Sequence, residues 1–299
     1  MYTRRTRSLK FLLNTFGHQV IWYGPYLVLV YVSYEYLGYE QLDIKMSIAT
    51  VLGFAVALLL GFRTSASYDR WWEARKIWGG IVNDSRTLVR QLIGFVGTDE
   101  VTPETKTMVK YQIAWINSLK NSLRGLNPLE GIENYLTANE VKNIAESINK
   151  PNEILKLQTN LISHLRKREV IDSFQQIAID QSLKNLCDHM GKAERIKNTV
   201  FPTHYRSYTH RGVMIFTVML PFGMLYSTGP FVILICLLVS FFFNMLENIA
   251  MHLQDPFMNR DSDIPMSALC RTIEINLLEL VEEKNVPKPM QPDSRGILM

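Results

Sequence analysis

The sequence predicts an all-α protein with four membrane spans and a helical cytoplasmic region. Three observations lead to this fold class: stretches of chain without charge, basic residues gathered beside those stretches, and apolar residues at helical spacing elsewhere. The overall composition, 47% hydrophobic and 20% charged, suits a soluble protein as well as a membrane protein. The separation of charged from apolar segments therefore carries the argument.

Three uncharged stretches cover residues 20–34, 46–62 and 212–246. The third holds the turn sequence Ser227–Pro230, and because a Gly-Pro pair interrupts helices we expect two helices joined by a tight turn. A helix needs about 20 residues to cross the hydrocarbon core, so these are short spans. The alternative, four buried helices of a soluble protein, leaves little polar chain to cover them. The predicted spans are residues 19–36, 46–63, 212–227 and 230–248.

Basic residues beside the spans predict the orientation, since cytoplasmic loops carry an excess of Lys and Arg. The loop between the first two spans is mostly acidic, which places it outside. We therefore expect an integral protein with both termini in the cytoplasm and with lipid around it. A basic N-terminus also suits nucleic acid, but the apolar run behind it favours the membrane, so no nucleic-acid partner is expected. The basic residues used are Arg4, Arg5, Arg7, Lys10, Arg63, Arg70, Arg206 and Arg211.

Residues 64–211 and 249–299 are predicted to be cytoplasmic, and the whole chain, 1–299, is read as a single unit. Apolar residues three and four apart predict packed helices, and no strand alternation stands out. Thr137 and Glu140 form a capping box that starts a short helix. The proline-rich tail from residue 286 onward is expected to be loosely held. The predicted cytoplasmic helices are residues 65–97, 104–124, 152–168, 173–200 and 265–285.

Catalytic signatures are missing from the sequence: no nucleophile elbow, Walker loop, zinc-protease helix or dinucleotide fingerprint occurs. The chain is therefore not expected to be an enzyme. The three cysteines, Cys187, Cys236 and Cys270, have no metal or redox spacing and suit a reducing compartment. Three aspartates after the fourth span are weak metal candidates, because carboxylates at that density bind Ca²⁺. Capping and salt bridging explain them better, so no cofactor is expected; they are Asp255, Asp261 and Asp263.

The second predicted span carries two adjacent rows of residues with a period of four. One row is small, which lets membrane helices approach closely, and the other is large and apolar. Rings of large apolar side chains form constrictions that gate by dewetting, so the second row suits the wall of a pore. A lipid-facing or core stripe has the same spacing and is the alternative. The rows are Gly53, Ala57 and Gly61, and Phe54, Leu58 and Phe62.

The same segment resembles a known family. Gly61-Phe62, followed by Arg70-Trp71-Trp72, and the later Asp255-Pro256-Phe257 together resemble the bestrophins, especially their bacterial members. The resemblance implies a homopentameric ion channel with four spans per subunit, placed here in a bacterial inner (plasma) membrane. It implies that small monovalent ions pass a hydrophobic neck, which falls on the large row of the second span.

The resemblance also implies a second, cytosolic aperture, which aligns near Ile171. Where eukaryotic members bind calcium, this chain has the sequence Met258–Asp263, so calcium gating is not expected. Selectivity between chloride and cations stays open, because aromatic edges favour anions and faces favour cations. The alternative function is a membrane-anchored scaffold or sensor whose region 64–211 binds a partner.

Overall fold

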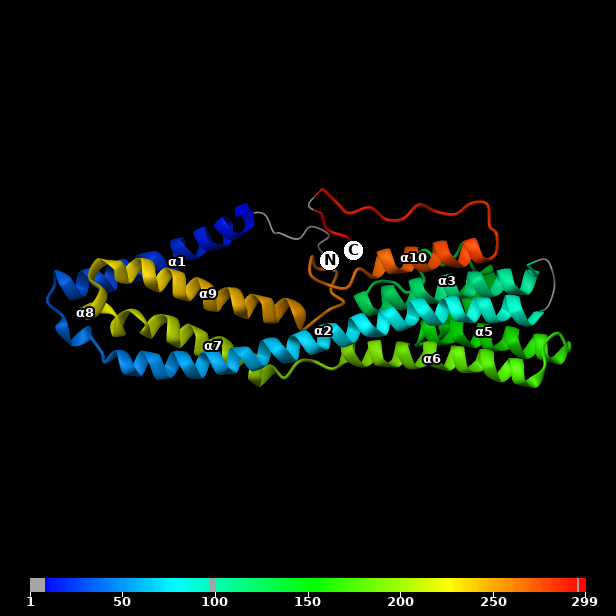
Figure 1. The fold of residues 1–299 in the computed structure, drawn as a ribbon, viewed down its shortest axis with the longest axis horizontal. Helices are drawn as coiled ribbons and strands as arrows, with labels where there is room; N and C mark the ends of the chain where they lie inside the picture. Colours follow the sequence, from blue (N-terminus) through cyan, green and yellow to red (C-terminus); the bar gives the residue numbers. More distant parts are fainter. Residues whose placement is uncertain (1–8, 97–100, 295) are drawn as a thin grey trace. The chain divides into compact units, whose positions relative to one another are not determined.

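The computed structural model describes residues 9–96, 101–294 and 296–299. The basic residues Arg4, Arg5 and Arg7 lie outside the described part. The prediction of an all-α chain is confirmed, since the described ranges contain helices and no β-strand (Figure 1). The ten α-helices of these ranges are α1 (Leu9–Glu35), α2 (Met46–Val96), α3 (Pro103–Arg124), α4 (Ala138–Glu146), α5 (Lys150–Lys167), α6 (Ser173–Asn198), α7 (Thr203–Met219), α8 (Leu225–Thr228), α9 (Val232–Leu253) and α10 (Met266–Leu280). Three short 3₁₀ helices cover Glu40–Leu42, Pro221–Gly223 and Gly229–Phe231.

The chain divides into two compact units. One, here called the bundle unit, consists of Trp71–Thr199 and Asp255–Met299. The other, the apolar unit, consists of the described residues 9–70 and of Val200–Gln254. Helix α2 contributes its first half to the apolar unit and its second half to the bundle unit, so the predicted boundary at residue 63 falls inside one helix. No proline interrupts α2, which allows it to continue.

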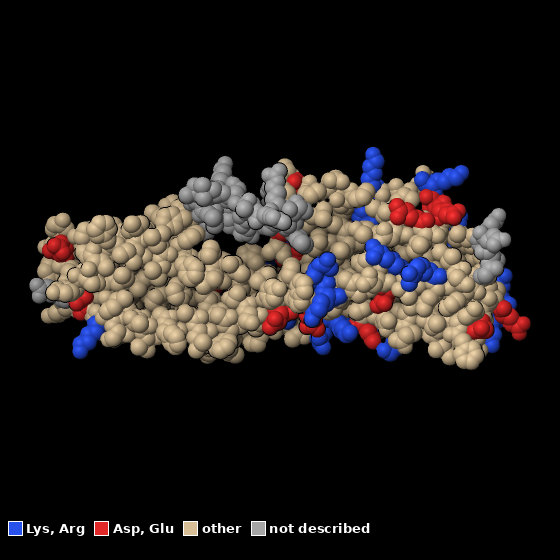
Figure 2. Space-filling view, in the orientation of Figure 1, with Lys and Arg blue, Asp and Glu red and all other residues tan. Residues whose placement is uncertain are grey.

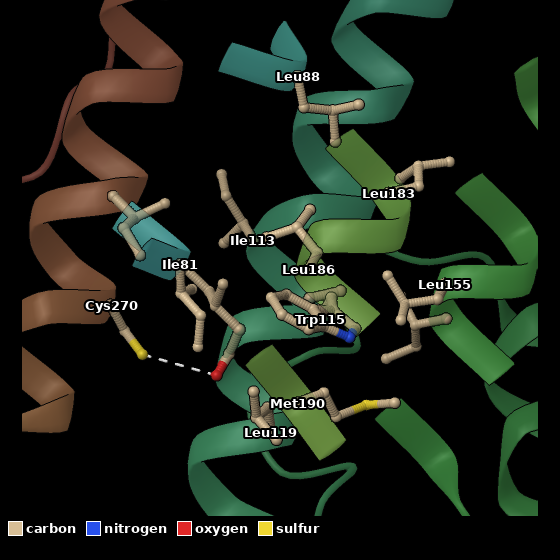
Figure 3. Close-up of a cluster of buried hydrophobic side chains, with 14 of the residues drawn as sticks. Ile81, Leu88, Ile113, Trp115, Leu119, Leu155, Leu183, Leu186, Met190 and Cys270 are labelled. Carbon is tan, nitrogen blue, oxygen red and sulfur yellow. Dashed lines mark hydrogen bonds between the residues drawn. The ribbon is translucent and has the colours of Figure 1, made fainter. Parts of the chain in front are cut away.

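The bundle unit has a large hydrophobic core. Helix α3 packs against α5, α6 and α10, and its Trp115 is wholly buried beside Leu186 and Met190 of α6 (Figure 3). A chain of buried hydrogen bonds crosses this core: Gln158 Nε2 donates to Gln112 Oε1 at 2.9 Å, and Gln112 Nε2 donates to Ser85 Oγ at 2.8 Å. These bonds connect α5, α3 and α2. They also give the buried amides hydrogen-bond partners, which polar groups in a protein core need.

The apolar unit packs α1 and α7 against α9. Its core is smaller and includes Leu27, Leu60, Phe216 and Cys236. By length and composition, two described helical stretches, Met46–Val96 and Leu225–Leu253, are apolar enough to cross a membrane. The predicted third span, 212–227, is not one helix, since α7 ends at Met219 and a 3₁₀ turn begins at Pro221.

The ends of the elements outside the predicted spans also differ in detail from the prediction. Both hydrogen bonds of the Thr137–Glu140 capping box are present, so that prediction is confirmed. Helix α10 ends at Leu280, earlier than expected. The tail is not loose at its end: Ile297 is buried, and the Ala268 N–H donates to the Met299 carbonyl at 3.0 Å.

Candidate functional site: an exposed apolar row on helix α2

The two faces of the first half of α2 differ in burial. Val56 and Leu60 are 3% and 1% exposed and belong to the core of the apolar unit. On the other side, Phe54, Leu58 and Phe62 are 72%, 49% and 62% exposed. With about 100° of rotation per residue, the exposed row points away from the buried one. The large row of the second predicted span is therefore not a core stripe within the chain.

The three residues of the small row, Gly53, Ala57 and Gly61, do not share one contact surface. Gly53 lies under Phe216 of α7, and a Cβ atom there would come within 2.8 Å of the Phe216 ring. A Cβ atom added at Gly61 would meet nothing within 4 Å, and the side chain of Ala57 is exposed. Gly53 therefore serves packing between α2 and α7 of the same chain, whereas Ala57 and Gly61 stay on the open side beside the large row.

A buried ion pair follows the exposed row directly. Arg63 is 0% exposed, and its Nη1 lies 3.3 Å from Oε1 of Glu247 on α9. The same oxygen lies 2.9 Å from Nδ1 of His210 on α7. One carboxylate thus joins three helices of the apolar unit at the end of the row. The Tyr205 hydroxyl adds a bond from α7 to the Leu59 carbonyl, at 2.9 Å.

The Arg63 guanidinium is incompletely paired. Its Nε and Nη2 are buried and find no hydrogen-bond acceptor among the residues that the structure describes. Breaking the pair would leave a full charge buried, which is costly, so Arg63 and Glu247 hold each other in place. Sequence reasoning missed this cluster, although charged residues that bound membrane spans are a signal for partners within the protein.

The residue expected to line a cytosolic aperture, Ile171, is buried in the structure. Ile171 is 1% exposed and lies in the core of the bundle unit. A side chain inside its own subunit's core has no surface with which to line an opening. Two apolar residues in the first turns of α6 are open instead, Phe174 at 83% and Ile177 at 66%.

Helix α6 is joined to α2 at a close approach that the sequence did not reveal. A Cβ atom at Gly80 would lie 2.4 Å from the ring of His189, so any other residue there would displace the ring. His189 Nε2 lies 3.0 Å from Oδ2 of Asp84, one turn further along α2. The glycine lets the ring lie against the helix backbone, where Asp84 orients it.

The aspartates after α9 do not assemble as metal ligands. Asp263 is buried, and its Oδ2 accepts the Arg260 N–H at 3.0 Å, which closes a turn. Within the described ranges, no three His, Cys, Asp or Glu side chains come together as a metal site would require. The structural role of Asp263 agrees with the capping explanation; Asp255 and Asp261 also have interactions of their own.

Comparisons with known proteins cover most of the chain. The family described as bacterial/fungal bestrophin protein matches residues 16–279. The voltage-dependent anion channel-forming protein YneE of Escherichia coli K12 is 31% identical over 257 residues, 85% of this chain and 84% of that protein. A protein with the same descriptive name from Ralstonia nicotianae, RSc3414, is 30% identical over 237 residues, 79% of this chain and 78% of that one.

Solved structures agree with these sequence matches. A bacterial bestrophin homologue from Klebsiella pneumoniae superposes with a TM-score of 0.83 at 30% identity, over 92% of this chain and 100% of that chain. A structure described as a membrane protein carrying one alanine substitution superposes with a TM-score of 0.85 at 31% identity, over 92% and 100% of the two chains. The similarity therefore covers both units.

Proposed function

The chain belongs to the bacterial and fungal bestrophin family, and we propose that five copies of it surround one pore whose neck is lined by Phe54, Leu58 and Phe62. As a bestrophin it is an integral membrane ion channel rather than an enzyme. In the proposed assembly each subunit contributes four spans, and both termini lie in the cytoplasm of a bacterial cell. The proposed permeant ions are small and monovalent.

The observation that carries the neck is the exposure of three large apolar side chains on one face of α2. Burying such a side chain is worth about 1.5–3 kcal/mol, so a row left exposed by its own subunit gains from a further neighbour. Either lipid or other copies of the chain supply that neighbour. The row ends at the ion pair between Arg63 and Glu247, which fixes the rotation of α2 by bonding it to α9.

Such a row suits a gate more than a binding site. Large apolar side chains in a ring exclude water when the opening narrows. Ions cannot then pass, because they would have to give up their hydration shell to enter the dry constriction. Curated relatives are named anion channel-forming proteins, which makes chloride the first ion to test. Phe174, the most exposed apolar side chain at the start of α6, replaces Ile171 as the candidate for a second aperture.

The neck is tested by current recordings of the purified protein in planar bilayers. Replacing Phe54, Leu58 and Phe62 together by Ala should raise the conductance several-fold or abolish closing, because the opening widens and stays wet. The matched control is the triple Ala variant of Leu234, Leu238 and Phe242, which have the same spacing on α9 and are 53%, 52% and 53% exposed. It should leave the currents unchanged. Unchanged currents in the α2 variant, or equal changes in both, would contradict the proposed neck.

Selectivity and assembly need separate measurements. In a NaCl gradient the sign of the reversal potential distinguishes chloride from sodium conduction. The mass of the detergent-solubilised assembly should be five times the chain mass of 34.5 kDa. Any other stable stoichiometry contradicts the pentamer, even if the protein conducts.

A further inference from the structure

Helix α7 has an outer stripe that changes character along its length. Residues 204, 208, 211, 215 and 218 alternate in steps of four and three, so they lie on one face of the helix. The first three are polar, His204, Tyr208 and Arg211, and the last two are apolar, Ile215 and Val218. All five belong to the apolar unit.

The stripe is open throughout. Tyr208 is 61% exposed, Ile215 is 56% exposed and Val218 is 46% exposed. Met214, beside Ile215, is also 56% exposed. The inner side of α7 is different, since Val213 and Phe216 are 1% and 5% exposed and pack into the core. Helix α7 is therefore fixed to its own subunit on one side and presents the stripe on the other.

The polar end of the stripe is basic and has no acid to neutralise it. Helix α7 contains no Asp or Glu. Glu247, which α7 does contact, is buried and already pairs with Arg63 and His210. Among the described residues, neither Arg206 nor Arg211 has an ion-pair partner, and both are exposed.

The aromatic rings at this end are ordered. The rings of His204 and Tyr208 stack with centroids 6.0 Å apart and planes 28° from parallel. Tyrosine gathers where hydrocarbon meets the polar headgroups, because its ring is apolar and its hydroxyl is polar. Arg211 follows Tyr208 by one turn and precedes the apolar part of the stripe directly.

We propose that this stripe is a binding site for an anionic phospholipid. Arg211 and Tyr208 bind the phosphate headgroup, and an acyl chain lies along Met214, Ile215 and Val218. The order of residues matches the order of groups in the lipid, with charge at one end and hydrocarbon at the other. A folded protein partner would require an acidic surface continuous with an apolar one inside the bilayer, whereas phospholipid has this arrangement by its nature.

The test uses the full chain in detergent with phosphatidylglycerol as the probe. Bound lipid is counted by native mass spectrometry over a lipid titration, with phosphatidylcholine in a parallel titration. One basic residue near anionic lipid contributes about 1 kcal/mol, so Arg211→Gln should weaken phosphatidylglycerol binding about five-fold. Phosphatidylcholine, which has no net charge, should bind more weakly to the wild type and be little affected by the substitution.

Arg206→Gln is the matched control. It removes the same charge from the same helix, but residue 206 lies about 140° away from residue 211 around the axis. The proposal predicts a smaller loss for Arg206→Gln than for Arg211→Gln. Equal losses indicate general attraction to a basic surface and overturn the site.

Two further measurements separate the remaining explanations. Ile215→Asn places a polar amide in the apolar part of the stripe and should also weaken lipid binding, without changing the mass of the assembly. If inorganic phosphate displaces the lipid from the wild type, the site recognises a free anion and the lipid proposal is wrong. If Arg211→Gln changes the number of subunits instead, the stripe is a contact between copies of the chain, and the proposal is equally wrong.

Discussion

The bundle unit and the apolar unit each contain an ion pair between distant helices, and the two pairs differ in burial. In the bundle unit the ion pair of Arg195 and Glu73 lies at the surface, with side chains 63% and 41% exposed. In the apolar unit the pair of Arg63 and Glu247 is 0% and 5% exposed. Exposed pairs contribute about 0–1 kcal/mol, while removing one partner of a buried pair costs about 3–5 kcal/mol. The pair of Arg63 and Glu247 therefore matters more for stability than the pair of Arg195 and Glu73.

The two units also differ in what they expose. On the face drawn in Figure 2, charged side chains gather over the helices of the bundle unit, and the part made of α1, α7 and α9 shows few of them. The apolar unit exposes many large apolar side chains, such as Trp22, Phe54 and Phe231 at 75%, 72% and 68%, whereas the bundle unit exposes fewer, among them Phe174 at 83%. A bundle with a polar surface is adapted to water. A unit with this apolar surface suits contact with lipid, and in the proposed assembly also with further copies of the chain.

The largest expected effect comes from breaking the buried pair. Glu247→Ala leaves the Arg63 guanidinium buried without a carboxylate and His210 without its acceptor. We expect a loss of about 3–5 kcal/mol, seen as a large drop in the unfolding midpoint of the detergent-solubilised protein. Glu73→Ala, which breaks the exposed pair with Arg195, should cost at most about 1 kcal/mol.

A double variant sharpens this comparison. Arg63→Met together with Glu247→Leu removes both charges and should recover most of the stability, since buried pairs are often replaced by apolar residues without loss. If the double variant is as unstable as Glu247→Ala, the cost is not due to an unpaired charge. In that case the contrast between the units would rest on packing alone.

A smaller effect is expected at the glycine of the bundle unit. Gly80→Ala places a methyl group where the His189 ring lies, so the ring must move and lose its bond to Asp84. We expect a destabilisation of about 1–3 kcal/mol, measured by chemical or thermal unfolding. Gly79→Ala is the control, because its Cβ atom would meet only Arg75 Nη1, at 3.8 Å. That variant should be neutral or more stable by up to about 1 kcal/mol; a similar loss in both variants would show that the close approach is unimportant.

The smallest expected effect is at the capping box of α4. Burial raises the pKa of the Glu140 carboxyl, but hydrogen bonds from the Tyr111 hydroxyl and from Thr137 outweigh it, so the net pKa is lowered. Because the folded-state pKa is depressed, the stabilisation is present above the ordinary value of 4.5 and is lost as the pH falls through the lowered one. Glu140→Gln should cost about 1 kcal/mol or less at neutral pH.

The pH dependence provides the check on this prediction. The difference in unfolding midpoint between the wild type and Glu140→Gln should shrink in acid, below the ordinary carboxyl pKa of 4.5. Glu146→Gln changes an exposed carboxylate of the same helix outside the capping box and should have little effect at either pH. A difference that persists unchanged in acid would mean that the charge of Glu140 is not what stabilises the cap.

Much of the fold follows from local patterns in the sequence, and the family prediction is confirmed by the comparisons. The capping box at Thr137 was predictable because both partners lie within one turn. The exposed row on α2 was also predictable, because a period of four places its members on one face. Its role as a neck stays a prediction.

Other features depend on contacts between distant parts of the chain. Ile171 lies just before α6, and the sequence gives no sign that it is less exposed than Phe174. In the structure Ile171 is buried and Phe174 is exposed. Nothing in the local sequence indicates that Gly80, and not its neighbour Gly79, is the glycine that lies against His189. In both cases tertiary packing, rather than the local sequence, decides which of two nearby residues lies against another part of the chain.

The separation of Arg63 and Glu247 along the chain also determines when during synthesis the pair can form. The two residues are 184 positions apart. At about 5–20 residues per second, a ribosome makes Arg63 roughly 10–40 seconds before Glu247. During that interval the guanidinium needs water or lipid headgroups in place of its later partner. The apolar unit therefore completes its folding only late in synthesis, and a chain that stops before residue 247 keeps an uncompensated charge at the end of its apolar row.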